Sequence, residues 1–147
     1  MRTLFNNLNM FFQLGDRCPS KVVELNEESG QITSPGYPMQ YENFLNCMYR
    51  ITVGPNDRIK IDFEDFETEE EYDWVELFDG DSTDATSLGK FSGRLNRQSM
   101  NTSSNQLFVK FVSDEGVSLR GFKLSYSTLK DEGKKIIFIL VIMFKLL

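Results

Sequence analysis

Hydrophobic and polar residues alternate with a period of two along the central part of the chain. In the stretch RIKIDFE, residues 58–64, every second residue is apolar and the residues between are charged. Residues 46–53, 106–111 and 121–127 alternate in a similar way. This period is typical of β-strands with one buried face, because successive side chains point to opposite faces. The side chains expected inside are Cys47, Tyr49, Ile51, Val53, Ile59, Ile61, Phe63, Leu107, Val109, Phe111, Phe122, Leu124 and Tyr126.

Clusters of turn-forming residues separate these alternating stretches. They occupy residues 34–36, 54–57, 79–82 and 101–105, and are rich in Gly, Pro, Asn, Asp and Ser. No stretch of the central region has the 3.6-residue period of an amphipathic helix. Many short strands with regularly placed turns predict an all-β protein, an antiparallel sandwich or barrel.

Composition is consistent with a single domain that has a real core. The chain has 147 residues, of which 40% are hydrophobic and 13% aromatic. Its net charge of −6 argues against nucleic acid as a partner, because phosphate contacts need a concentrated basic patch. A negative chain suits cationic partners, either a metal ion or a lysine-bearing surface.

The absence of histidine excludes several kinds of site. With no histidine in the sequence, neither a Ser-His-Asp nor a Cys-His nucleophile can be assembled, and histidine-ligated zinc is impossible. We therefore predict that the chain has no catalytic residues and is not an enzyme. Catalysis by a pair of carboxyl groups, as in glycosidases, needs no histidine and is not excluded by this argument. The two cysteines, Cys18 and Cys47, can form one bridge within the chain or remain as buried thiols.

The densest charge lies in a run where seven of the ten residues 64–73 are acidic. Such runs are commonly a solvated face of a protein. This run, however, is embedded among aromatic and aliphatic residues that favour burial. Carboxylates are also the ligands that calcium prefers, so a bound cation would allow this much negative charge beside a core.

Six segments of the chain follow the order of landmarks in one protein family. They are Cys18 and the stretches GQITSPGYPMQYENFLNC (30–47), RIKIDFEDF (58–66), YDWVELFDG (72–80), LGKFSG (88–93) and NQLFVKFVSDEGVSLRGFKLSYS (105–127). In this order they resemble a CUB domain. The resemblance implies an antiparallel jelly-roll β-sandwich in an extracellular or secreted protein, of the kind found in tolloid-like and complement proteases.

The chain departs from the usual family pattern at the second disulfide. One of its two cysteine positions holds Ser92, and the other is lost within ETEEEYD (67–73), which is a few residues shorter than usual. A paired loss of this kind indicates a two-cysteine subtype. The resemblance then implies a disulfide between Cys18 and Cys47.

Many CUB domains bind one calcium ion at one end of the sandwich. The residues that match the family's ligands are Glu69, Asp73 and Asp114, and Tyr41 matches a tyrosine that braces the ligating Glu. Because the loop is shortened, Glu67 or Glu70 is an alternative to Glu69. In several CUB complexes a lysine of the partner reaches the acidic residues around the ion. The resemblance therefore implies calcium binding and an extracellular protein partner that presents a lysine.

Both ends of the chain differ from the central region. Residues 1–17 lack the apolar run and small-residue cleavage pattern of a signal peptide. Residues 129–147 form a polar linker and an apolar tail that is shorter than the ~20 residues of a membrane-spanning helix. The tail also resembles a glycolipid-anchor signal in outline. A further alternative is that both ends are errors of gene prediction. We place the CUB-like domain at residues 18–128, and expect membrane contact only if the tail is an anchor.

Three functional hypotheses follow. The first is a calcium-dependent extracellular interaction module, and the second is a calcium-independent structural or adhesion module. The third is a non-catalytic fragment of a secreted protease that carries CUB domains. The triplet Asn101-Thr102-Ser103 is a sequence for N-glycosylation, which is used only if the chain is secreted.

Overall fold

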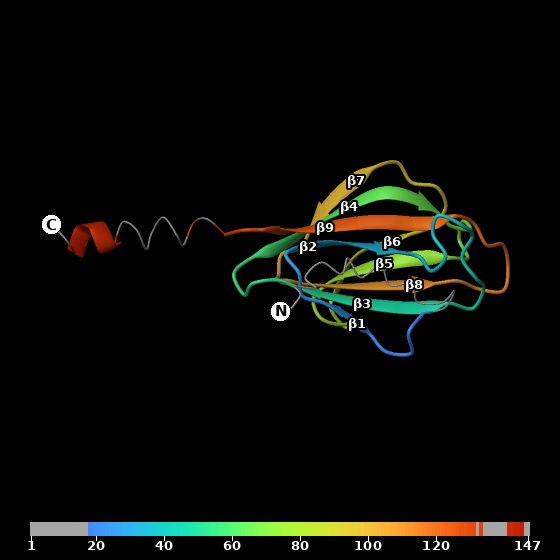
Figure 1. The fold of residues 1–147 in the computed structure, drawn as a ribbon, viewed down its shortest axis with the longest axis horizontal. Helices are drawn as coiled ribbons and strands as arrows, with labels where there is room; N and C mark the ends of the chain where they lie inside the picture. The colour runs from blue at the N-terminus through green and yellow to red at the C-terminus, as the bar shows by residue number, and fades with distance from the viewer. Residues whose placement is uncertain (1–17, 132, 134–140, 146–147) are drawn as a thin grey trace, which may run out of the picture.

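The β-strands of this protein form two sheets that pack face to face (Figure 1). The computed structural model describes residues 18–131, 133 and 141–145. The five-stranded sheet has the order β1 (Val23–Leu25), β3 (Asn46–Thr52), β8 (Gln106–Val112), β5 (Trp74–Asp79) and β6 (Thr86–Phe91). The four-stranded sheet has the order β2 (Ser29–Thr33), β9 (Gly121–Leu129), β4 (Arg58–Glu67) and β7 (Gln98–Asn101). The predicted antiparallel β-sandwich is therefore confirmed.

One strand pair differs from the antiparallel pattern. β1 runs parallel to β3, with Val23 opposite Tyr49. β1 has only three residues and lies at the edge of its sheet, so its direction leaves the remaining pairs unaffected. The other strand pairs of the described chain are antiparallel.

The core lies between the two sheets, and the alternating pattern predicted its members. Twelve of the side chains expected inside have at most 9% of their surface exposed, and Tyr49 is partly buried against the same cluster. Aromatic rings fill one end of this core: the Phe111 and Phe122 rings meet edge to face with centroids 5.1 Å apart. Tyr41 approaches Phe111 in the same way at 5.3 Å.

A bulge in β4 explains how part of the acidic run lies beside the core. The pairing of β4 with β9 shifts between Phe63 and Asp65, so one extra residue is inserted. As a result Phe63 and Phe66, three residues apart, both point inward and are 2% exposed. The two acidic residues between them are partly exposed, and there Lys123 pairs with Glu64 and Arg120 pairs with Asp65.

The Cys18–Cys47 disulfide expected from the family resemblance is present. It joins the segment before β1 to β3, across 29 residues of chain, with the two Cα atoms 4.9 Å apart. Residues 1–17, the predicted N-terminal segment, lie outside the described residues. Most of the apolar tail also lies outside the described residues. Its residues 141–145 are described and are helical. No helix among the described residues is long and apolar enough to cross a membrane.

Candidate functional site

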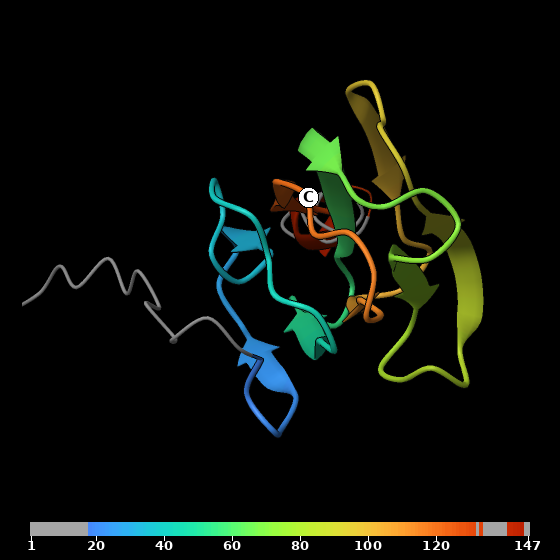
Figure 2. The same cartoon turned by 90° about the vertical axis from the view of Figure 1, so that its right-hand side faces the viewer.

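Three loops meet at one end of the sandwich. They are residues 34–45 between β2 and β3, residues 68–73 between β4 and β5, and residues 113–120 between β8 and β9. Strand register brings them together, because Asn46 and Trp74 both lie opposite Val112. Figure 2 looks onto this end, with the first loop in cyan, the second in green and the third in orange.

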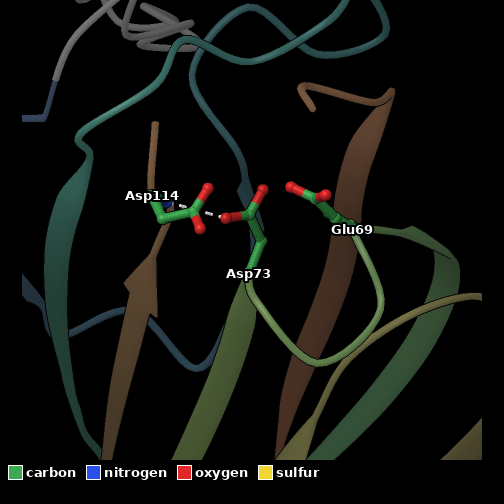
Figure 3. Close-up of side chains that lie close together, drawn as sticks. All are labelled: Glu69, Asp73 and Asp114. Atoms are coloured by element: carbon green, nitrogen blue, oxygen red, sulfur yellow. Dashed lines mark hydrogen bonds between the residues drawn. The ribbon is translucent and has the colours of Figure 1, made fainter. Parts of the chain in front are cut away.

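The predicted acidic residues converge in these loops. Glu69, Asp73 and Asp114 each offer a carboxylate oxygen, and these oxygens lie within 4.8 Å of one another. Figure 3 shows the three side chains turned toward one another, with Asp73 in the middle. Asp73 is 1% exposed, whereas the other two are partly exposed. Two loops that belong to different strand connections thus build one group of carboxylates.

Backbone and side-chain donors fix the orientation of each carboxylate. The Asp114 N–H donates to Asp73 Oδ1 at 2.8 Å, which is the contact drawn in Figure 3. The Val117 N–H donates to Glu69 Oε2 at 2.8 Å, and the Gly116 N–H donates to Asp114 Oδ1 at 2.6 Å. Because every carboxylate accepts a bond from the β8–β9 loop, the three acidic groups are held as one unit.

The electrostatics of this unit favour a cation. Burial raises the pKa of Asp73 above its usual range, against hydrogen bonds from Tyr41 and the Asp114 N–H that lower it, and the charges of Asp114 and Glu69 raise it further. A cation at the oxygens would offset the effects of burial and of the neighbouring negative charges, and would favour the charged form of all three groups. Hard carboxylate oxygens suit calcium or magnesium, and the three residues fit such an ion.

Tyr41 lies behind the carboxylates, in the core. Its hydroxyl donates to Asp73 Oδ2 at 2.5 Å and accepts from the Glu69 N–H at 3.1 Å. The family pattern placed this hydroxyl on the ligating Glu side chain, whereas the structure places it on the Asp73 carboxylate and the Glu69 backbone. Burial raises the pKa of Tyr41, so its hydroxyl stays protonated and acts as a donor to Asp73.

The two alternative glutamates lie outside the group. Glu67 is the last residue of β4 and forms ion pairs with Arg94 and Arg120. Glu70 is exposed, and its side chain lies against Gly93. Of the three glutamates considered, Glu69 is the one whose carboxylate joins Asp73 and Asp114.

Two residues that sequence reasoning did not assign to the site hold its loops. The Ser92 hydroxyl accepts from the Glu71 N–H at 2.7 Å and donates to the Glu69 carbonyl at 3.1 Å. The Asn43 side chain donates to the carbonyls of Glu115 (2.8 Å) and Gly116 (3.2 Å). The sequence analysis treated Ser92 only as the replacement of a cysteine. Its place at the usual second disulfide, next to the shortened loop, was the signal that could have indicated its role. Asn43 carries no signal in a single sequence, because its partners are backbone atoms of a distant loop.

Neither the possible glycosylation residue, Asn101, nor the single tryptophan, Trp74, belongs to the group of carboxylates. Asn101 ends β7 and is exposed, on the side of the sandwich opposite the three loops, while the next residue, Thr102, is buried. Trp74 lies on the outer face of the five-stranded sheet, where Lys90 Nζ stands 4.0 Å from its ring centroid and Lys110 Nζ stands 5.7 Å away.

Comparison with known proteins agrees with this architecture. The family model for the CUB domain matches residues 18–126. The chain belongs to the CUB domain family. Tolloid-like protein 1 from Homo sapiens is 36% identical over 115 residues, and tolloid-like protein 2 from Mus musculus is 35% identical over 113 residues. These matches cover 76% and 74% of this chain but 11% of each relative, so this CUB chain spans about a tenth of their length.

Solved CUB structures share both fold and sequence with this chain. The CUB1-EGF-CUB2 domains of rat MASP-1 are 31% identical, with a TM-score of 0.68, and the match covers 78% of this chain and 45% of that one. The full extracellular region of zebrafish Gpr126/Adgrg6 is 34% identical, with a TM-score of 0.66 over 73% of this chain and 14% of that one. The MASP-1 CUB2 domain bound to Ca2+ is 28% identical, with a TM-score of 0.64 over 71% and 96% of the two chains.

Proposed function

We propose that this CUB domain is an extracellular protein-interaction module that binds one calcium ion through Glu69, Asp73 and Asp114. The observation that carries the proposal is the convergence of these three carboxylates within 4.8 Å, with the central one buried. A solved CUB domain that is 28% identical is described as bound to Ca2+, which supports calcium as the ion. The ion would join the β4–β5 loop to the β8–β9 loop, in addition to their hydrogen bonds.

The partner would be a protein that presents a lysine to the same carboxylates. A calcium ion fixes the carboxylates, and the oxygens that face solvent accept charge-assisted hydrogen bonds from an ammonium group. Seven acidic residues occupy the three loops of this end, against a single basic residue, Arg120. That balance favours a cationic partner and supports the calcium-dependent module over a calcium-independent spacer.

Calorimetric titration of calcium tests the ion site. We expect wild type to bind one ion and Glu69→Gln to bind at least about 10-fold more weakly, because one of three charged ligands is lost. This substitution keeps an oxygen that can accept the Val117 N–H, so the fold should survive. Glu70→Gln makes the same chemical change one residue later, outside the group, and should bind calcium as wild type does. Equal affinities for the two variants, or no binding to wild type, would reject the proposal.

Thermal unfolding separates the two kinds of module. A ligand that binds only the folded state stabilises it by about 2.7 kcal/mol at a concentration 100 times its Kd. For a domain of this size we expect a rise of several degrees in Tm between EDTA and millimolar calcium. Identical melting curves in the two buffers would favour the calcium-independent structural module.

A further inference from the structure

The large hydrophobic side chains that the sandwich leaves exposed gather at the end that carries the carboxylates. Within residues 18–131, four such side chains are exposed, and we call them the apolar rim: Met39 (74%), Phe44 (75%), Tyr72 (60%) and Val117 (55%). They come from the three loops that meet around the candidate calcium site (Figure 2). The opposite end of the sandwich has no exposed large hydrophobic residue within the same range.

Three of the four members of the apolar rim adjoin a residue of the acidic group, either in the chain or through a hydrogen bond. Tyr72 directly precedes Asp73. The Phe44 N–H donates to the Asp114 carbonyl at 2.9 Å, and the Val117 N–H donates to the Glu69 carboxylate. Met39 lies two residues before Tyr41, in the same loop. The exposed hydrophobic side chains and the carboxylates therefore lie in the same three loops, at one end of the sandwich.

Phe44 is an exposed aromatic residue that contributes little to the stability of the fold. Its φ of 60° lies in the left-handed region, where glycine or asparagine is favoured and a bulky side chain is rare. The side chain is 75% exposed, so it contributes little to the core. A strained position that holds an exposed aromatic side chain is typical of a binding surface.

We propose that the apolar rim docks the apolar side chains that flank the basic residue of the partner. The inference rests on the proposed function and specifies its ligand: a protein segment in which a lysine lies between large hydrophobic residues. The lysine would meet the carboxylates, and its neighbours would cover Met39, Phe44, Tyr72 and Val117. Such an arrangement excludes water from the charged contact, which strengthens it.

Charge decides between a protein segment and a membrane as the occupant. Hydrophobic residues at loop tips can also enter a lipid surface. The loops of this end carry seven acidic residues; Arg120 offsets one and a bound calcium ion offsets two, which leaves four negative charges. An anionic lipid surface would repel that charge, whereas a lysine-bearing segment is attracted by it.

Two peptides of equal length and charge test the proposal against the full chain. One has a lysine flanked on both sides by leucine and phenylalanine, and the other has a lysine flanked by serine and glycine. In millimolar calcium we expect the first to bind wild type at least about 10-fold more tightly, because its side chains are buried on binding. In the double variant Met39→Ser/Phe44→Asn this preference should fall to about 3-fold or less. Gln40→Ser, an exposed polar change in the same loop, should leave it intact.

Folding and calcium binding of the double variant are measured in parallel. Asparagine tolerates the φ of Phe44, so we expect an unchanged or higher Tm and wild-type calcium affinity. Equal binding of both peptides by calcium-loaded wild type would overturn the apolar rim proposal and leave the calcium proposal standing. A preference for the apolar peptide that persists in EDTA, with no calcium binding, would reject the calcium proposal alone.

Vesicles of phosphatidylserine and phosphatidylcholine test the competing occupant. We expect no co-sedimentation of wild type with these vesicles in calcium. Co-sedimentation that the Met39→Ser/Phe44→Asn double variant loses, together with equal binding of the two peptides, would overturn the proposal in favour of a lipid surface.

Discussion

At the scale of single residues, two hydroxyl groups organise the acidic loops of this CUB domain. Tyr41 contacts the buried Asp73 carboxylate and the Glu69 N–H, while Ser92 contacts the Glu69 carbonyl and the Glu71 N–H of the same loop. Both are linked to the calcium proposal through the residues they hold rather than through the ion. Removal of either hydroxyl therefore gives a separate measurement of how strongly the protein positions its carboxylates.

Tyr41→Phe removes one oxygen and keeps the ring. We expect the calcium affinity to fall about 10-fold or more, as when a partner that orients a metal ligand is lost. The metal-free protein should lose about 1–2 kcal/mol of unfolding free energy, because a buried acceptor and a donor lose their partner. Calorimetry in calcium and urea unfolding in EDTA measure the two effects.

Tyr37→Phe is the matched control for that experiment. The Tyr37 hydroxyl also donates to a carboxylate, that of Asp65 at 2.9 Å, but Asp65 is not among the three converging residues. Calcium affinity should be unchanged in this variant. If Tyr41→Phe also binds calcium like wild type, Tyr41 is only a core aromatic residue.

Ser92→Ala tests whether the serine in the place of the family's cysteine holds the shortened loop. The Glu71 N–H loses its acceptor, so its amide should exchange with solvent at least about 5-fold faster, since one bond contributes about 1 kcal/mol. Hydrogen exchange of that amide is the measurement. Ser87→Ala, which removes a serine hydroxyl bonded to Glu76 on the preceding strand, should leave it unchanged. Unaltered exchange at Glu71 in Ser92→Ala would show that Ser92 does not hold the loop.

At the scale of strands and loops, the two ends of the sandwich differ in how their acidic groups are satisfied. At the end that carries Glu69, Asp73 and Asp114, carboxylates face one another. At the other end, Asp79 closes β5 and accepts bonds from the Ser103 N–H (2.8 Å), the Ser104 N–H (3.1 Å) and the Ser104 hydroxyl (2.9 Å). These hydrogen bonds tie β5 to the turn between β7 and β8.

The pH dependence of stability should report on Asp79. Burial raises its pKa, but the donors of Ser103 and Ser104 outweigh burial and hold the pKa below its ordinary value of 3.8. A lowered pKa in the folded state stabilises the protein above the unfolded pKa, and this contribution is lost as the pH falls through the folded pKa. We therefore expect Asp79→Asn to cost about 1–2 kcal/mol at pH 7 and less below pH 4.

Urea unfolding in EDTA at pH 7 and at pH 3 measures this difference and excludes any effect of calcium. Asp81→Asn is the control, because the Asp81 residue is exposed and lies just beyond the same strand. A loss in Asp79→Asn that is equal at both pH values would contradict the proposed role of its charge.

At the scale of the whole molecule, one disulfide closes a long loop that includes β1 and β2. Because Cys18 and Cys47 are 29 residues apart, the chain-entropy estimate gives about 3–4 kcal/mol of stability. We expect reduction, or the double variant Cys18→Ala/Cys47→Ala, to lower the unfolding free energy by about this amount. Mass spectrometry without reduction should detect a linked Cys18–Cys47 peptide, and free thiols in the folded protein would contradict the structure.

The sequence alone determined the central strands β3, β4, β8 and β9, most of the core and the family. These depend on local properties: side chains alternate along a strand whatever its neighbours are, so Ile59, Ile61 and Phe63 could be assigned to the interior directly. The resemblance also indicated Glu69, Asp73 and Asp114 as one group, because their places relative to the turn motifs match the family.

Only the tertiary structure decided how distant segments meet. The bulge at Phe63 and Asp65, the contact of Tyr41 with Asp73 and the bonds of Ser92 depend on the register between strands and on the conformation of loops far apart in the sequence. The apolar rim also depends on the tertiary structure. Phe44 and Tyr72 are aromatic residues, which from the sequence would be expected in the core. Their exposure follows from the conformations of two separate loops, and the pattern of hydrophobic and polar residues does not predict those conformations.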